Sequence, residues 1–164
     1  MGVTDNHWYR FLAARPYLNE VNFWRPGGGR RFQALTPGEP FFFKTHYPHN
    51  QVVGGGFYSG FAALSVSEAW GLFGEGNGAD SLADLRRLVG AYRHEPIRAG
   101  DDPTIGCVFV RDTRFFADHD VVMPPADFLP NIVQGKGYSL GADAGARSQA
   151  RRFDRSCKQP TFGR

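Results

Sequence analysis

Five histidines and two cysteines are the side chains of this sequence best suited to hold a metal ion or move a proton. His46 and His49 stand three positions apart, so both could reach one metal ion if the turn between them is tight. No cysteine, aspartate or glutamate stands close enough in sequence to complete a ligand set. Cys107 and Cys157 lie far apart, which indicates two reduced thiols in a cytosolic protein. A metal site is therefore the weaker interpretation of these residues.

Acid–base or nucleophilic catalysis has equally little support. Asp118-His119-Asp120 could move protons, but a polar turn between two short strands explains this tripeptide better. The sequence contains no Gly-x-Ser-x-Gly, Walker or His-Glu-x-x-His motif. We therefore expect a binding module and not an enzyme, with no catalytic residue, metal or cofactor.

Residues 44–57 have the composition of a binding surface. A polar turn that contains Tyr47-Pro48 joins an apolar strand to a second strand with three consecutive glycines, Gly54-Gly55-Gly56. Glycine inside a strand usually marks a bulge or a close contact with the backbone. We expect these glycines to leave space for a ligand, with the preceding turn as its receiving edge.

The charge of the chain is unevenly distributed. The net charge is +3, but residues 147–164 contain six basic residues and one acidic residue, a net +5. The other 146 residues contain thirteen basic and fifteen acidic residues, a net −2. An anionic partner would therefore be bound by local basic clusters and not by the whole surface. No apolar run approaches the ~20 residues of a membrane span, so we expect no membrane partner.

The elements that must position these residues are short and numerous. The chain has 164 residues, which suits one domain, and its 21 glycines and 11 prolines favour short strands and turns. Thr4 or Asp5, Ser65 or Ser67, and Ser81 are candidate N-caps of three helices. The expected strands are 21–24, 31–35, 41–44, 52–59 and 105–111, with shorter ones at 115–116 and 121–123. We expect an α+β fold, a small, partly open β-barrel flanked by short helices.

Three segments together resemble a known family: Glu20-Val21-Asn22-Phe23-Trp24, the block 38–57, and Asn131-Ile132-Val133-Gln134-Gly135-Lys136-Gly137-Tyr138. They are similar to the DNA sulfur-binding domain of McrA-type HNH restriction endonucleases. The block 38–57 also resembles PUA/EVE/SRA-like barrels, which read modified nucleic acids. The resemblance implies a PUA-like recognition domain at 1–140 and a basic linker at 141–164, which would lead to an HNH nuclease domain in cis.

The function that this resemblance implies is the binding of phosphorothioate-modified double-stranded DNA. The parent protein would be a type IV, modification-dependent restriction enzyme in the bacterial cytoplasm. Tyr47 and Pro48 look like the pair at the family's sulfur cavity, an apolar notch that accepts sulfur more readily than a well-hydrated oxygen. The residues expected to contact DNA phosphates or bases are Arg30, Arg31, Lys44, His46, His49, Asn50, Gln51, Asn131, Gln134 and Lys136.

Two alternatives remain open. A PUA- or SRA-like reader would flip a modified base into an aromatic pocket that contains Trp24 or Trp70. Both tryptophans are also typical of a hydrophobic core. An RNA-processing or hydrolytic enzyme would instead use His46, His49 or His119. The arginine-bearing loop 25–31 is equally consistent with a solvated loop, and Asn131 and Gln134 with residues that only cap loop backbone.

Overall fold

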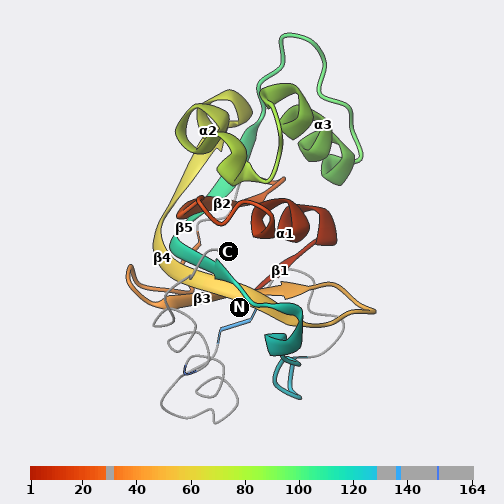
Figure 1. Cartoon of the computed structure of the whole chain (residues 1–164). Helices are drawn as coiled ribbons and strands as arrows, with labels where there is room; N and C mark the ends of the chain where they lie inside the picture. Colours follow the sequence, from red (N-terminus) through yellow and green to blue (C-terminus); the bar gives the residue numbers. More distant parts are fainter. Residues whose placement is uncertain (29–31, 129–135, 138–150, 152–164) are drawn as a thin grey trace.

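The computed structural model describes residues 1–28, 32–128, 136–137 and 151. The fold is a mixed α+β arrangement of five strands, three α-helices and two 3-10 turns (Figure 1). In chain order these are β1 (Gly2–Thr4), α1 (Asn6–Ala13), β2 (Glu20–Arg25), β3 (Pro40–Thr45), β4 (Val52–Ser65), α2 (Val66–Phe73), η1 (Gly74–Asn77), α3 (Leu82–Arg93), β5 (Thr104–Phe115) and η2 (Asp118–Asp120).

The five strands form one sheet in the order β1-β3-β4-β5-β2. Only the β1–β3 pair is parallel. The sequence predicts a small, partly open barrel; the mixed α+β fold is confirmed, but the sheet is not closed into a barrel, because β1 and β2 are its two edges. The edges nevertheless approach each other: a Cβ on Gly2 of β1 would lie 2.8 Å from the ring of Phe23 on β2. The sheet is therefore strongly rolled, and side chains instead of hydrogen bonds fill the gap between its edges.

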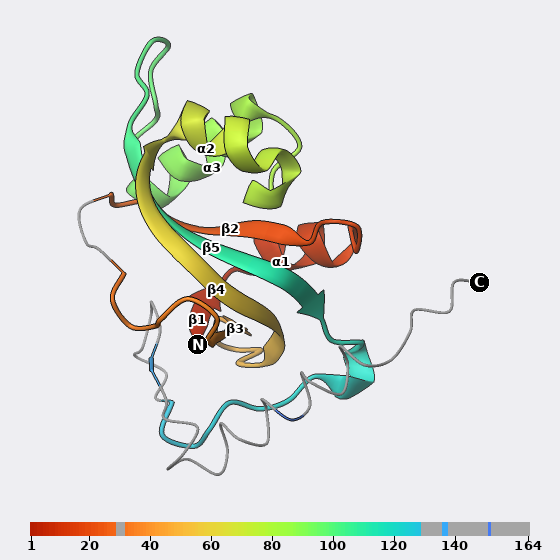
Figure 2. The same cartoon turned by 90° about the vertical axis from the view of Figure 1, so that its left-hand side faces the viewer.

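The long antiparallel pair β4–β5 forms the middle of the sheet. Figure 2 shows how strongly both strands curve, with α2 and α3 together at one end and β1 and β3 at the other. The register of this pair shifts twice, between Gly55 and Phe57 and between Tyr58 and Gly60. Such bulges increase the local twist and bend of a strand. They therefore account for much of the roll of the sheet.

All three helices begin at residues that local chemistry selects. Asp5 caps α1 by accepting a hydrogen bond from the Trp8 amide at 2.7 Å. Ser65 caps α2 in a reciprocal capping box with Glu68, and Ser81 caps α3 by accepting from the Asp84 amide. The sequence predicts all three helices, and each observed cap is among its candidates, because a cap depends on residues only three positions apart. No helix among the described residues is long and apolar enough to cross a membrane.

Three hydrophobic clusters hold the described elements together, and the two larger ones pack the helices against the sheet. The largest one packs α1 into the rolled sheet, with Trp8 of α1 5.1 Å from Phe43 of β3 between ring centroids. Phe23 and Phe43 stack with an interplanar angle of 9°. The second cluster packs α2 and α3 against β5, through residues that include Val66, Leu85 and Ile105. Aromatic side chains thus occupy the space that a closed barrel would enclose.

The three glycines of β4 do not receive a ligand. A Cβ on Gly54 would lie 2.4 Å from the Arg114 carbonyl oxygen, and one on Gly56 would lie 2.5 Å from Val110. A Cβ on Gly55 would lie 2.8 Å from the Phe41 carbonyl oxygen. The close contact that the sequence indicates is therefore real, but its partners are β3 and β5. The prediction of a ligand at this position is wrong.

Two other sequence-based expectations also need correction. Residues 32–35 form no strand. The short strand expected at 121–123 is a single bridge between Val52 and Val122, and Phe115 belongs to β5. Of the basic linker predicted at 141–164, only Arg151 lies within the described residues.

Candidate functional site

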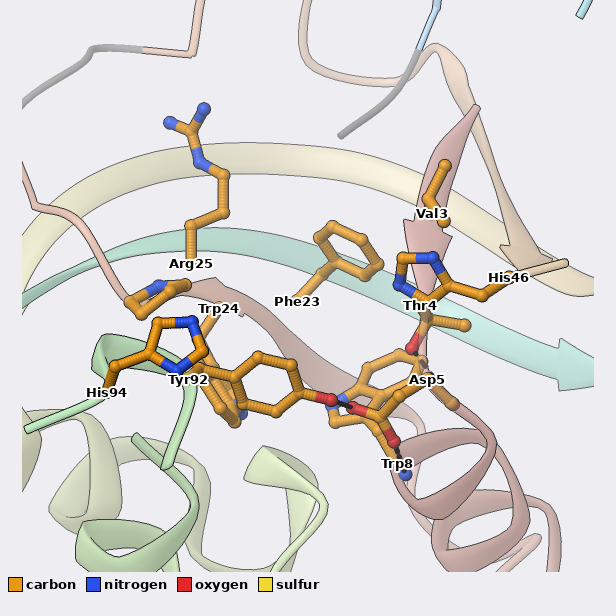
Figure 3. A pocket seen from close by; sticks show the side chains of 11 residues that line it. Val3, Thr4, Asp5, Trp8, Phe23, Trp24, Arg25, His46, Tyr92 and His94 are labelled. Carbon is orange, nitrogen blue, oxygen red and sulfur yellow. Dashed lines mark hydrogen bonds between the residues drawn. The ribbon is translucent and has the colours of Figure 1, made fainter. Parts of the chain in front are cut away.

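A pocket of about 460 Å³ lies where β1, β2, the start of α1, the C-terminal end of α3 and the turn after β3 meet. Figure 3 shows His46 and His94 entering from opposite sides, with the rings of Phe23 and Tyr92 between them. This volume falls within the usual range for small-molecule pockets. The pocket is lined by Val3, Thr4, Asp5, Trp8, Phe23, Trp24, Arg25, Pro26, His46, Tyr92 and His94.

The aromatic residues of the pocket are held at defined angles. Trp24 and Tyr92 meet edge to face, with ring centroids 5.7 Å apart, and Trp8 and Phe23 do the same at 5.6 Å. The Trp24 indole donates a hydrogen bond to the main-chain oxygen of Asn77 at 2.9 Å. Trp24 is therefore anchored from behind, so its ring presents a fixed surface to the pocket.

Asp5 connects two walls of the pocket. Its carboxylate accepts one hydrogen bond from the Trp8 amide and a second from the Tyr92 hydroxyl at 2.5 Å. Burial, followed by the hydrogen bond to Asp5 and its charge, strongly raises the pKa of Tyr92. The phenol therefore stays protonated near neutral pH and continues to donate to Asp5. This link fixes the end of α3 to the start of α1.

Three cationic or titratable side chains surround the aromatic surface. The Arg25 guanidinium lies 5.5 Å from the Phe61 ring centroid and 6.0 Å from that of Phe32, which are cation–π distances. Burial lowers the pKa of Arg25, but an arginine remains charged at neutral pH. His46 and His94 are exposed at the rim. A flat, partly anionic ligand would therefore find both stacking surfaces and positive charge here.

The turn at 46–50, called here the 46–50 turn, supplies one wall of the pocket. The Thr45 amide donates to the Gln51 carbonyl at 2.9 Å, and the Gln51 amide donates to the Thr45 hydroxyl at 3.1 Å. The Asn50 amide donates to the His46 carbonyl at 3.0 Å, and Asn50 has a positive φ of 48°. The turn is therefore closed by main-chain bonds at its base and across its tip.

The sequence-predicted residues of this turn share one edge. His46 contributes to the pocket wall, whereas Tyr47, Pro48 and His49 are exposed. The Tyr47–Pro48 peptide bond is cis. Asn50 is half-buried, and so is Gln51, whose main chain bonds to Thr45. The structure thus places these residues together, although the pocket includes neither Tyr47 nor Pro48.

The two lysines predicted to contact phosphate are already engaged within the chain. Lys44 is 3% exposed, donates to the Thr45 carbonyl at 2.9 Å and lies 4.7 Å from the Phe128 ring centroid. Lys136 forms an ion pair with Asp127 and also donates to its main-chain oxygen at 3.0 Å. In this arrangement the Lys44 ammonium faces the protein interior, and a phosphate on the surface would not reach it.

Four other predicted residues, Arg30, Arg31, Asn131 and Gln134, lie outside the described residues. His119 is exposed, 3.4 Å from Asp120 and remote in sequence from the residues of the pocket. Trp70 belongs to the cluster beneath α2 and α3, so of the two candidate tryptophans only Trp24 lines the pocket. Among the described residues no group of three His, Cys, Asp or Glu side chains is placed to hold a metal ion.

Sequence reasoning missed the pocket itself, because five separate parts of the chain build it. Helical spacing along α3 does not reveal that Tyr92 is 43% exposed and lines a pocket. Asp5 was identified only as a helix cap, and His94 only as one of five histidines. Two signals in the sequence point to this site: Trp24, a possible pocket residue, and His46, a residue expected to contact DNA.

The structure is similar to crystal structures of the ASCH protein from Zymomonas mobilis. The ASCH protein aligns with a TM-score of 0.54 at 12% sequence identity, over 94% of this chain and 93% of that one. Its tyrosine-to-phenylalanine variant gives 0.57 at 13% identity over 92% and 96%, and its serine-to-alanine variant 0.56 at 13% over 92% and 94%. No family model matches the sequence, and no curated protein is similar to it. At this identity the likeness establishes the ASCH, PUA-like fold alone.

Proposed function

We propose that this chain is a nucleic-acid-binding module whose aromatic pocket receives one nucleobase. The observation that carries this proposal is the pocket between α1, β2 and α3, where Trp24 and Tyr92 offer aromatic surface and Arg25, His46 and His94 surround it. A base stacks on such rings, and the Arg25 guanidinium attracts the phosphate attached to it.

Two further features support the proposal. The basic excess of the chain lies in residues 147–164, a net +5, and a basic segment of this kind favours an anionic partner. The PUA-like fold is also the one that the sequence resemblance associates with readers of modified nucleic acids. A base carried out of its stack into the pocket would be read by the groups at its walls, with Asp5 and Tyr92 as the polar pair nearest to the rings.

Replacing Tyr92 by alanine should weaken the binding of a nucleotide by about tenfold or more, because one aromatic surface of the pocket is lost. Isothermal titration calorimetry with the four ribonucleoside 5′-monophosphates and their base-methylated forms would measure this change. Tyr17→Ala is the matched control, because Tyr17 is 65% exposed and bonds to Glu75. Equal affinity in wild type and Tyr92→Ala would contradict the pocket as the binding site.

A second candidate is the sulfur-reading module that the sequence resemblance implies. The exposed Tyr47–Pro48 step, with histidines on both sides, supports it. In that case the partner is phosphorothioate-modified duplex DNA. The chain would then direct an HNH nuclease domain in cis within a cytoplasmic bacterial restriction enzyme, with 1–140 as the reader and 141–164 as the linker.

Pro48→Ala separates this candidate from the first. If the turn reads sulfur, wild type should bind a phosphorothioate duplex more tightly than the same duplex with oxygen, and Pro48→Ala should lose that preference because water enters the apolar notch. An electrophoretic mobility shift with the matched pair of duplexes measures both effects. Equal binding of the two duplexes by the wild type would exclude sulfur reading and leave the base-binding pocket unaffected.

A further inference from the structure

Among the described residues three tyrosines are exposed, and two of them have an evident structural role. Tyr17 and Tyr92 are 65% and 43% exposed, and their hydroxyls donate to Glu75 and Asp5 at 2.8 and 2.5 Å. Tyr47 is the most exposed of the three, at 78%. Its hydroxyl has no hydrogen-bond partner among the described residues. The fold therefore gives Tyr47 no visible structural role.

Tyr47 is next to the pocket in the sequence. His46, the preceding residue, lines the pocket, so the two Cα atoms are separated by one peptide bond. The bonds between Thr45 and Gln51 and between Asn50 and His46 fix the 46–50 turn on both sides of Tyr47. An exposed tyrosine thus directly follows a residue that lines the aromatic pocket, on a turn that hydrogen bonds close.

We propose that Tyr47 is a stacking platform for the base that neighbours the base in the pocket, so that the partner is an oligonucleotide and not a free nucleotide. This inference rests on the proposed function. Consecutive bases of a strand are one backbone unit apart. When one base occupies the pocket beside His46, we therefore expect the next base to lie close to Tyr47. A tyrosine ring stacks on any base, so this contact adds affinity with little sequence preference.

The chemistry of the turn fits this role. Leaving a large ring in water gives up the free energy of burying its apolar surface, and stacking on a base would recover part of it. His49 is also exposed on the turn, and its imidazole could donate a hydrogen bond to a phosphate of the same strand. Tyr17 provides the contrast: its exposure is similar, but the ion-paired Glu75–Arg15 group already holds its hydroxyl.

The experiment compares two ligands on four proteins. The dissociation constants of a ribonucleoside 5′-monophosphate and of an unmodified single-stranded pentanucleotide of the same base are measured by calorimetry for wild type, Tyr47→Ala, Tyr47→Trp and Tyr17→Ala. We expect wild type to bind the pentanucleotide more tightly. Tyr47→Ala should lose about tenfold for the pentanucleotide and nothing for the monophosphate. Tyr47→Trp should retain the wild-type affinities, and so should Tyr17→Ala.

The possible failures have different meanings. If Tyr47→Ala binds both ligands like wild type, or loses affinity for both equally, the platform is overturned while the pocket proposal stands. If wild type binds the pentanucleotide in a Tyr47-dependent manner but binds no monophosphate, Tyr47 contacts the strand without an occupied pocket beside it, and the inference is overturned together with the base pocket. If folded wild type binds neither ligand, both proposals are overturned.

Discussion

The variant Gly54→Ala should lose about 3 kcal/mol of unfolding free energy. A Cβ at this position would lie 2.4 Å from the Arg114 carbonyl oxygen and 3.0 Å from the Phe115 Cα, both of them main-chain atoms of β5. Backbone cannot rotate away as a flexible side chain can, so β4 and β5 would have to separate locally. Urea denaturation followed by circular dichroism would give the free energy.

Gly71→Ala is the matched control for this prediction. Gly71 lies in α2 with nothing within 4 Å of its potential Cβ. Alanine is favoured over glycine in a helix by about 1 kcal/mol, so this variant should be as stable as wild type or more stable. The same chemical change should therefore have opposite signs at the two positions. A loss below about 1 kcal/mol for Gly54→Ala would mean that the two strands are less tightly packed than described here.

The glycines of β4 also show what a sequence can and cannot tell about this fold. Three glycines in a strand correctly indicate that other atoms lie close to the main chain, but the sequence does not show whether these atoms belong to a ligand or to the protein. Here it is the adjacent strands of a rolled sheet, whose curvature depends on bulges and on register. The helix caps could be predicted, because Ser65 and Glu68 interact within one turn of the chain.

The limits are similar for the candidate site. The polar turn around Tyr47 could be identified because its residues are consecutive in sequence. Its neighbour Lys44 shows the opposite case: a lysine at the end of an apolar strand suggests a surface charge, but the Phe128 ring covers it. The pocket depends on the contact between Asp5 and Tyr92, which are 87 positions apart. Only the roll of the sheet brings such residues together, so no pattern within a short stretch of sequence predicts their contact.

The variant Asn77→Ala should also destabilise the protein by about 3 kcal/mol, because it leaves several buried polar groups without partners. Asn77 is fully buried, and its amide nitrogen donates to the Ala69 and Gly74 carbonyls at 3.0 and 2.8 Å. Its side-chain oxygen accepts from the Asn22 amide at 2.9 Å. Each buried group left unpaired costs about 1–3 kcal/mol, although such costs are not additive. Urea denaturation measures the total.

A double-mutant cycle with Asn22→Ala makes this prediction specific. Asn22 also donates to the Cys107 sulfur at 3.3 Å, but its own side-chain oxygen is buried without a hydrogen bond among the described residues. Removing Asn22 therefore relieves one unsatisfied group while creating another, and should cost less than removing Asn77. The loss of unfolding free energy in the double variant should be about 1 kcal/mol smaller than the sum of the two single losses. Each single variant breaks the 2.9 Å hydrogen bond between Asn22 and Asn77, but the double variant loses this bond only once. Additive losses would show that the two amides do not form one network. The main-chain oxygen of Asn77 also accepts the hydrogen bond of the Trp24 indole. A coupled Asn22–Asn77 pair would therefore mean that the buried core holds Trp24 in position before any ligand binds.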